Sequence, residues 1–374
     1  MKRDKIRVVE LSGTAYEMGQ QHGTAYPQEI RRYAHERVEL VAAGQWTGHK
    51  LTTDQVLTLA EECIPAHEAY SPDLMAETRG LADATGLTLG EAIIASGFTD
   101  FIDTVHNVYN QRQATTLTAQ PIDDCTAFIV ADEIADGAGF FGQTWDMHDT
   151  ATEFVILLNC KQTYMPEALM FTTVGCVGQI GMNSAGIAVG INNLMGADGQ
   201  VGVTWPFVVR KVLQQDNIDD ALACITDADL AGAHNFLLFD KTGRGYNIEA
   251  MPTHQHITEL GSGLSNGIVR QSGSIVHTNH CLVPETIAVA QERPPESQTS
   301  SETRLTRGYE LLEQHPVTID KLIDLTRDPQ AICVQSKPPF HVESCGAAIM
   351  RPKTGDFWAV WGLPSENEYE HFTI

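Results

Sequence analysis

Basic residues are scarce in this chain of 374 residues. Lysine and arginine number 24 against 48 aspartate and glutamate residues, so the formal net charge is −24. Nucleic acids bind basic surfaces that displace condensed counterions, and anionic membrane surfaces attract the same kind of charge. The composition therefore argues against nucleic-acid and membrane partners. Since an acidic surface also repels anions, it favours a neutral or cationic small-molecule substrate.

Long apolar runs and ordered cysteine patterns are missing too. The strongest apolar run near the middle covers only 154–158, too short to span a bilayer, and no apolar segment follows residues 1–5. The eight cysteines form no CxxC pair and no regular framework. We therefore expect a reduced, cytoplasmic protein without a secretory signal, in which all cysteines but one are ordinary buried residues.

The residues that are present indicate a globular protein, with 43% hydrophobic and 19% charged residues. The first third carries three helix-start signals: Thr52 with Gln55, Thr88 with Glu91, and Ser71 before Pro72. From Cys125 onwards, short apolar runs alternate with Gly, Asn and Asp, a spacing typical of antiparallel strands. Segregated runs of helices and strands favour an α+β fold in which helices cover stacked antiparallel sheets. The polar, Pro- and Ser-rich segment 292–303 predicts a surface loop, followed by a helix from Arg304 to Glu313.

Two motifs that could bind a ligand are better explained without one. Residues 137–142 match G-x-G-x-x-G, but a polar turn precedes them and a strand follows, so we interpret them as a hairpin turn rather than a dinucleotide site. Four histidines could supply imidazoles to a zinc ion: His254, His256, His277 and His280. No carboxylate or thiolate stands in a recognised arrangement with them. A metal enzyme is thus a minor alternative, and we expect no metal and no organic cofactor.

Cys125 opens an apolar strand at the start of a predicted β-hairpin. The strands 125–131 and 139–146 flank a polar turn centred on Ala135. Opposed residues of two antiparallel strands have residue numbers with a constant sum, here twice 135, which places Cys125 opposite Trp145. The hairpin therefore predicts that Cys125 and Asp146 are neighbours.

A cysteine nucleophile needs a base that takes its proton near neutral pH. The local sequence places no histidine beside Cys125, which leaves an α-amino group as the alternative base. If the chain were cut between Asp124 and Cys125, the new amine would have a reference pKa of about 7.7–8.0, well matched to a thiol proton. Amino-terminal nucleophiles use this chemistry. The site of cleavage would then be the Asp124–Cys125 bond.

Five motifs occur in order along the chain: the run 10–23 ending in Gln-Gln-His-Gly, Cys125-Thr126 with Trp145-Asp146, the hairpin 181–188, Ile248-Glu249, and His277-Thr278-Asn279-His280. On these motifs the sequence resembles the acyl-coenzyme A:6-aminopenicillanic acid acyltransferases and the related β-alanyl-amine hydrolases. The resemblance runs nearly end to end. It implies an autoproteolytic amino-terminal-nucleophile hydrolase with a four-layer αββα fold and two stacked antiparallel sheets.

The resemblance also implies how the chain is divided. The single domain 1–374 would consist of a mostly helical α segment, 1–124, and a β segment, 125–374, that carries the nucleophile. After self-cleavage the two segments would remain packed together.

The same resemblance assigns roles to residues. Cys125 would be the self-cleavage residue and the nucleophile, Asp146 would orient the new amine or assist cleavage, and Asn279 would donate its side-chain amide to the oxyanion. Three residues in or beside the motifs are expected to contact substrate: Thr144, Trp145 and Glu249.

Three positions depart from the family pattern. Asp124 stands where glycine is usual, and Thr144 stands where asparagine is common. After Ile332-Cys333, where the family often carries a basic residue, the sequence has Val334-Gln335. The last departure bears on substrate recognition, so a penicillin-type substrate is not carried over.

The sequence therefore predicts a self-processing zymogen that becomes a cysteine amidohydrolase and cleaves a small N-acyl amine through an acyl-enzyme on Cys125. One alternative is an acyltransferase that moves an acyl group from a thioester to an amine; few basic residues are at hand to bind coenzyme A phosphates. Another is an unprocessed binding or scaffold protein with the same fold, a reading that the unusual Asp124 motivates. The sequence is also compatible with a homo-oligomer.

Overall fold

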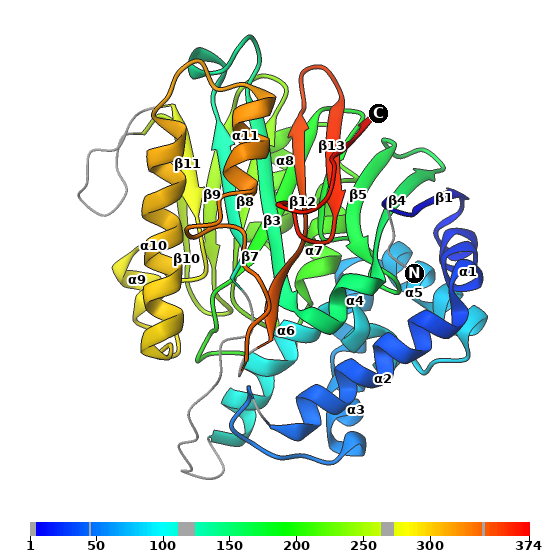
Figure 1. Ribbon diagram of the computed structural model, residues 1–374. Helices are drawn as coiled ribbons and strands as arrows, with labels where there is room; N and C mark the ends of the chain where they lie inside the picture. The colour runs from blue at the N-terminus through cyan, green and yellow to red at the C-terminus, as the bar shows by residue number, and fades with distance from the viewer. Residues whose placement is uncertain (1–4, 45, 111–123, 263–272, 339–340) are drawn as a thin grey trace.

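A computed structural model of the protein describes residues 5–44, 46–110, 124–262, 273–338 and 341–374. Within them, helices enclose two stacked β-sheets (Figure 1). Buried side chains of both sheets share one hydrophobic core between the sheets, and a second core joins the outer face of the smaller sheet to helices. This is the predicted α+β fold with αββα layers, which is confirmed.

The strands of the described residues form one six-stranded and one eight-stranded sheet. The smaller sheet runs in the order β11 (Ser274–His277), β2 (Thr126–Val130), β3 (Phe140–His148), β12 (Val342–Arg351), β13 (Asp356–Trp361) and β14 (Glu370–Thr373). The larger sheet runs in the order β1 (Val8–Gly13), β4 (Val155–Gln162), β5 (Ala168–Thr173), β6 (Ile180–Asn183), β7 (Ile187–Asn193), β8 (His234–Asp240), β9 (Gly245–Ala250) and β10 (Gln255–Glu259). Most neighbouring strands are antiparallel, but β1 pairs in parallel with β4.

Helices form the two outer layers. The chain before Cys125 supplies α1 (Ala15–Ala25), α2 (Pro27–Ala43), α3 (Thr53–Glu62), α4 (Ile64–Tyr70), α5 (Pro72–Thr85) and α6 (Leu89–Asn110), drawn blue to cyan in Figure 1. Two later helices, α7 (Trp205–Val212) and α8 (Ile218–Thr226), lie on the larger sheet, and α7 packs against α5 and α6. The smaller sheet is covered by α10 (Pro295–Leu312) and α11 (Ile319–Thr326), while the short α9 (Pro284–Ile287) lies by β10, the edge strand of the larger sheet.

The helix-start signals act as predicted. Thr52 caps α3 in a capping box with Gln55, and Ser71 caps α5 directly before its first-turn proline. The Thr88 and Glu91 side chains bond reciprocally to each other's backbone N–H at the start of α6. Short-range hydrogen bonds of this kind satisfy the free N–H groups of the first turn, and for that reason the local sequence reveals them.

The hairpin that carries Cys125 has the predicted register. Thr126 pairs with Thr144 and Ala127 with Gln143, so the residue numbers of each pair sum to twice 135. The G-x-G-x-x-G segment begins in the turn before β3, where Gly137 has a φ of 135°, and ends inside that strand. Glycine tolerates this angle at no steric cost, as the hairpin interpretation requires.

One element prediction is wrong. The segment 292–303 was expected to be a surface loop, but α10 begins at Pro295 and runs through it. The serines of this helix do not face solvent alone. Hydrogen bonds to other side chains of the protein are formed by Ser297, Ser300 and Ser301. The polar residues at these positions therefore belong to a helix that faces a polar site. Composition alone cannot distinguish such a helix from a solvated loop.

No helix among the described residues is long and apolar enough to cross a membrane.

Candidate functional site

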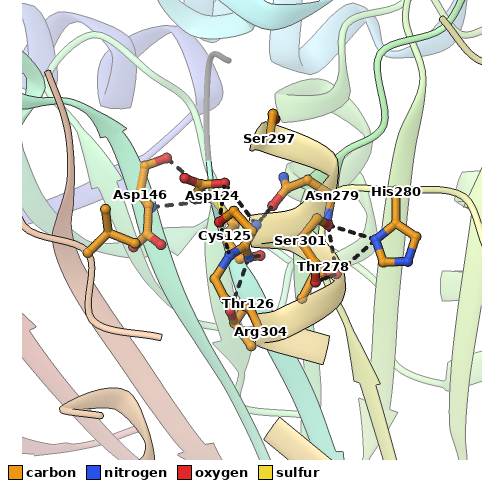
Figure 2. A network of polar contacts seen from close by, with 12 residues as sticks. Asp124, Cys125, Thr126, Asp146, Thr278, Asn279, His280, Ser297, Ser301 and Arg304 are labelled. Atoms are coloured by element: carbon orange, nitrogen blue, oxygen red, sulfur yellow. Dashed lines mark hydrogen bonds and ion pairs between the residues drawn. The ribbon is translucent and has the colours of Figure 1, made fainter. Parts of the chain in front are cut away.

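Cys125 directly precedes β2 and is 1% exposed. The backbone N–H of Asp146 donates to its Sγ at 3.5 Å, and Sγ lies 3.7 Å from the Asp146 carbonyl oxygen. Figure 2 shows both residues beside Asp124, at the centre of a polar network. The predicted neighbourhood of Cys125 and Asp146 is therefore confirmed, while their chemical roles stay predictions.

Two side chains hold the carbonyl oxygen of Cys125. Asn192, near the end of β7, donates from Nδ2 at 3.2 Å, and Arg304 of α10 donates from Nη1 at 2.6 Å. Asn192 is itself oriented by Asn235 on β8, which donates to its Oδ1 at 3.4 Å. Donors from the larger sheet and from a helix thus fix the residue that follows the predicted cleavage point.

Arg304 connects the parts of this network. Its Nη2 donates to Asp124 Oδ1 and to Asn279 Oδ1, both at 3.0 Å, and its Nη1 also reaches Thr126 Oγ1 at 3.2 Å. The side chain is 1% exposed, so these bonds form in a low-dielectric setting where charge-assisted hydrogen bonds are strong.

Asn279 is fully buried on the loop after β11. Its Nδ2 donates to the Asn193 carbonyl at 3.2 Å, while its Oδ1 accepts from Arg304. Its backbone N–H donates to Ser301 Oγ at 2.9 Å. Because the carboxamide oxygen faces Arg304, the nitrogen lies on the other side and serves as the donor, and its role toward an oxyanion stays a prediction.

His280 and Ser301 support the backbone of this loop. Ser301 Oγ lies 2.7 Å from His280 Nδ1 and 3.0 Å from Thr278 Oγ1. Burial lowers the pKa of His280 to about 3, and the neighbouring His277, Arg293 and Arg304 act in the same direction. The imidazole is therefore neutral at neutral pH, and it serves the loop as a hydrogen-bonding group.

Glu249 on β9 fixes the same loop from its other side. One carboxylate oxygen lies 3.0 Å from His277 Nε2 and accepts from the Leu282 backbone N–H at 2.6 Å; the other accepts from Thr286 Oγ1. Burial raises the pKa of Glu249, but His277 and the other donors outweigh burial and leave this pKa below its usual value. The contacts support a positioning role, because Asn279 lies within the tethered stretch.

Thr144 and Trp145 lie on β3 beside Cys125 and are buried. Thr144 Oγ1 accepts from the Thr126 backbone N–H at 3.2 Å. Trp145 packs edge-to-face against Phe171, with ring centroids 6.4 Å apart. The first contact holds the hairpin and the second joins the two sheets, and the substrate contacts expected of both residues stay predictions.

The other thiols provide a contrast, since all eight cysteines are free and buried. Burial raises the pKa of Cys63 to about 11 and that of Cys160 to about 12, so both resist ionisation.

The four histidines do not converge. His277 bonds to Glu249 and His280 to Ser301, while His254 and His256 lie at the edge strand β10. In the part of the chain that the structure describes, no group of three or more histidine, cysteine, aspartate or glutamate side chains could hold a metal ion.

A pocket of about 500 Å³ opens at His280. Its lining includes Leu194 and His280, which directly follow Asn193 and Asn279 in the sequence, together with Arg293 and Gln298. Pockets of this size hold small molecules.

Sequence reasoning missed Arg304, Asn192 and Ser301. Arg304 is 179 positions from Cys125 and Asn192 is 67 positions away, so no local pattern joins them. One weak signal was present, since the Asn192-Asn193 pair ends an apolar strand, where side-chain amides are unusual without a partner.

Comparison with known proteins places this geometry in context. A family model described as acyl-coenzyme A:6-aminopenicillanic acid acyl-transferase matches residues 134–366. The matched segment contains Asp146, Asn279 and Arg304. A curated relative from Emericella nidulans, the acyl-coenzyme A:6-aminopenicillanic-acid-acyltransferase 40 kDa form, is 26% identical over 276 residues, which are 74% of this chain and 69% of the relative.

Similar solved structures include the Caenorhabditis elegans ortholog of N-acylethanolamine-hydrolyzing acid amidase. It is 11% identical with a TM-score of 0.44, and the match covers 61% of this chain and 93% of that chain. Penicillin V acylase from Agrobacterium tumefaciens is 10% identical with a TM-score of 0.41, over 67% of this chain and 86% of that chain.

Proposed function

Because this chain belongs to the acyl-coenzyme A:6-aminopenicillanic acid acyl-transferase family, we propose that it is a self-processing amidohydrolase that cleaves a small N-acyl amine through an acyl-enzyme on Cys125. The family makes the chain an amide hydrolase or an acyltransferase. The observation that carries the finer proposal is the polar network around the Asp124–Cys125 bond, in which Arg304 holds both residues.

Self-cleavage begins with attack of Cys125 Sγ on the carbonyl carbon of Asp124. The C–N bond to Cys125 breaks, the acyl group moves to sulfur as a thioester, and the nitrogen becomes a free amine that has taken the thiol proton. Water then hydrolyses the thioester, which returns the thiol and leaves a carboxylate at Asp124. Residues 1–124 and 125–374 would remain packed, since α1 to α6 are buried against the rest of the molecule.

Turnover uses the new amine as the base. With a reference pKa of about 7.7–8.0, it takes the thiol proton as Sγ attacks the substrate carbonyl. Asn279 Nδ2 is the candidate donor to the oxyanion, and a donor of this kind is worth about 10²–10³ in kcat. The leaving amine departs protonated, and water releases the acid from Cys125. No cofactor takes part in these steps.

Asp146 contributes through its backbone N–H, which donates to Sγ, and its position beside Cys125 supports the proposal that it orients the new amine. Arg304 and Asn192 act as positioning residues on the carbonyl of Cys125.

Acyl transfer is the second candidate, and it differs only in the acceptor that attacks the acyl-enzyme. The low number of basic residues, 24 in the whole chain, supports hydrolysis over transfer from coenzyme A. Acyl release measured with and without an added amine separates the two, because a transferase forms a new amide when the amine is present.

The intact mass of the purified protein tests the proposal. We expect two polypeptides, the larger one beginning at Cys125, and a single inactive chain for Cys125→Ala. As a matched control, Cys224→Ala removes another buried thiol and should be cleaved and active. A single uncleaved wild-type chain with full amidase activity refutes self-processing, and an uncleaved, inactive wild-type chain favours the binding or scaffold alternative.

A further inference from the structure

The carboxylate of Asp124 is bound inside the site. Its Oδ1 accepts from Arg304 Nη2 at 3.0 Å and from Ser300 Oγ at 3.3 Å, and the side chain is 15% exposed. Ser300 and Arg304 are one turn apart on α10, so both donors come from one rigid face (Figure 2 shows Arg304 below Asp124). This is a built receptor for a carboxylate, and in the uncut chain its occupant is part of the protein.

Asp124 is the only carboxylate paired with Arg304 among the described residues. The other acceptors of this guanidinium are neutral oxygens, those of Cys125, Thr126, Asn279 and Ser300. A guanidinium that is 1% exposed is costly to leave without a counter-ion. If the end of the α segment leaves the site after cleavage, another carboxylate is needed in its place.

The position of Asp124 indicates which carboxylate this is. In self-cleavage, on which this inference rests, the carbonyl of Asp124 is the acyl group that Cys125 attacks. The side-chain carboxylate is separated from that carbonyl by two carbons, Cα and Cβ, as in a succinyl group. A substrate must bring its own carbonyl to the same Sγ, and its acyl chain then extends toward the two donors that Asp124 vacates.

We propose that Arg304 and Ser300 form an anion subsite for the substrate's acyl group, and that the substrate is an amide of a short dicarboxylic acid with about the carbonyl-to-carboxylate spacing of a succinyl group. The subsite concerns only the acyl half. The net charge of −24 still favours a neutral or cationic amine half, so the whole substrate would carry little net charge.

Two fluorogenic amides of the same amine test this proposal with the mature, cleaved protein. The N-succinyl amide carries the carboxylate, and the N-succinamoyl amide is its neutral isostere. We expect kcat/KM to be at least tenfold higher for the succinyl amide, with the difference chiefly in KM. Equal rates, or faster cleavage of the succinamoyl amide, overturn the anion subsite and leave the amidohydrolase proposal standing.

Variants on α10 locate the effect. Ser300→Ala should lower the succinyl-to-succinamoyl ratio of kcat/KM by several fold, because one of the two donors is lost. Thr299→Ala, an exposed neighbour whose hydroxyl bonds to the Pro295 carbonyl, should leave the ratio unchanged. An unchanged ratio in Ser300→Ala contradicts the subsite. A chain that stays uncut and cleaves neither amide refutes the proposed function itself.

Discussion

At the scale of single residues, the site depends on one buried cation. Arg304 touches the residue before the predicted cleavage point, the residue after it, and the carboxamide of Asn279. Its five acceptors come from three parts of the chain, the run 124–126, Asn279 and Ser300, so a change at one of them alters the setting of the others. For substitutions at these residues, the folding of the variant should therefore be measured before its activity is interpreted.

Asp124 should stabilise the uncut chain. In a Cys125→Ala background, which prevents cleavage, Asp124→Ala removes the carboxylate that Arg304 pairs with. We expect the free energy of unfolding to fall by about 1–3 kcal/mol, a value reduced from that of a fully buried pair because Asp124 is partly exposed. Urea denaturation measures it. Asp73→Ala, an exposed residue in the first turn of α5, should change stability by less than about 1 kcal/mol, and equal losses for both variants would contradict the pairing.

Asn279 should affect the rate more than substrate binding. Asn279→Ala removes the candidate oxyanion donor, so kcat per cleaved molecule should fall by about 10²–10³ with little change in KM. Asn217→Ala removes the cap of α8 at a cost of about 1 kcal/mol of stability and should keep kcat. A kcat within a few fold of the parent enzyme would exclude Asn279 as the donor.

At the scale of elements, the sequence predicted what neighbouring residues determine. The caps at Thr52 and Ser71 and the register of the β2–β3 hairpin depend on contacts within a few turns or one hairpin, and all are confirmed. Arg304 and Asn192 reach Cys125 from elements far along the chain, so only the packing of the two sheets and α10 reveals them. The same packing explains why the serines of α10 were misread as a loop.

Gln143 links the two sheets next to the site. This buried side chain on β3 donates to the Ile191 carbonyl on β7 and accepts from its backbone N–H at 3.0 Å, one residue before Asn192. The Gln143 side chain fits there because residue 190 is a glycine. A Cβ atom at position 190 would collide with the Gln143 side chain. The side chain thus sets the position of β7 relative to β3.

Gln143→Met should therefore lower stability and activity together. It leaves two buried main-chain groups unpaired, at about 1–3 kcal/mol each, and it frees Asn192 to shift away from Cys125. We expect kcat to fall at least tenfold in protein that is still folded by circular dichroism. Gln214→Met, which breaks the 2.8 Å bond to Gln162 far from the site, should lower the melting temperature and leave kcat intact. Loss of stability alone in Gln143→Met would show a purely structural link.

At the scale of the whole molecule, neutral imidazoles bridge the proposed α and β segments. His22 Nε2 on α1 accepts from the Gly175 N–H at 3.0 Å, and His67 Nε2 on α4 accepts from the Thr204 N–H at 3.1 Å. Each Nε2 accepts a hydrogen bond, so each ring is neutral with its proton on Nδ1. Burial lowers the pKa of both His22 and His67 to about 4.

These two bridges make the association of the segments sensitive to acid. The pKa is about 4 in the folded protein and 6.5 in the unfolded chain, so the unfolded chain binds more protons between these values. The stabilisation is complete above about pH 6.5 and is lost progressively as the pH falls toward 4, by about 3 kcal/mol for each imidazole. The buried His234 does not add to this acid sensitivity in the same way, because the nearby Asp100 carboxyl, 3.7 Å away, has a pKa raised by burial and acts in the opposite direction.

Cleaved protein should therefore separate into its two segments at about pH 4.5 and remain associated at pH 7, because no peptide bond joins the segments once the chain is cut. Size-exclusion chromatography coupled to light scattering measures the separation. Cys125→Ala keeps the peptide bond and is expected to elute as one chain of 40.9 kDa at both values. His67→Gln retains a neutral acceptor for the Thr204 N–H and removes one titrating group, so the midpoint of separation should move to lower pH. A midpoint equal to that of the parent protein would show that His67 does not control the association.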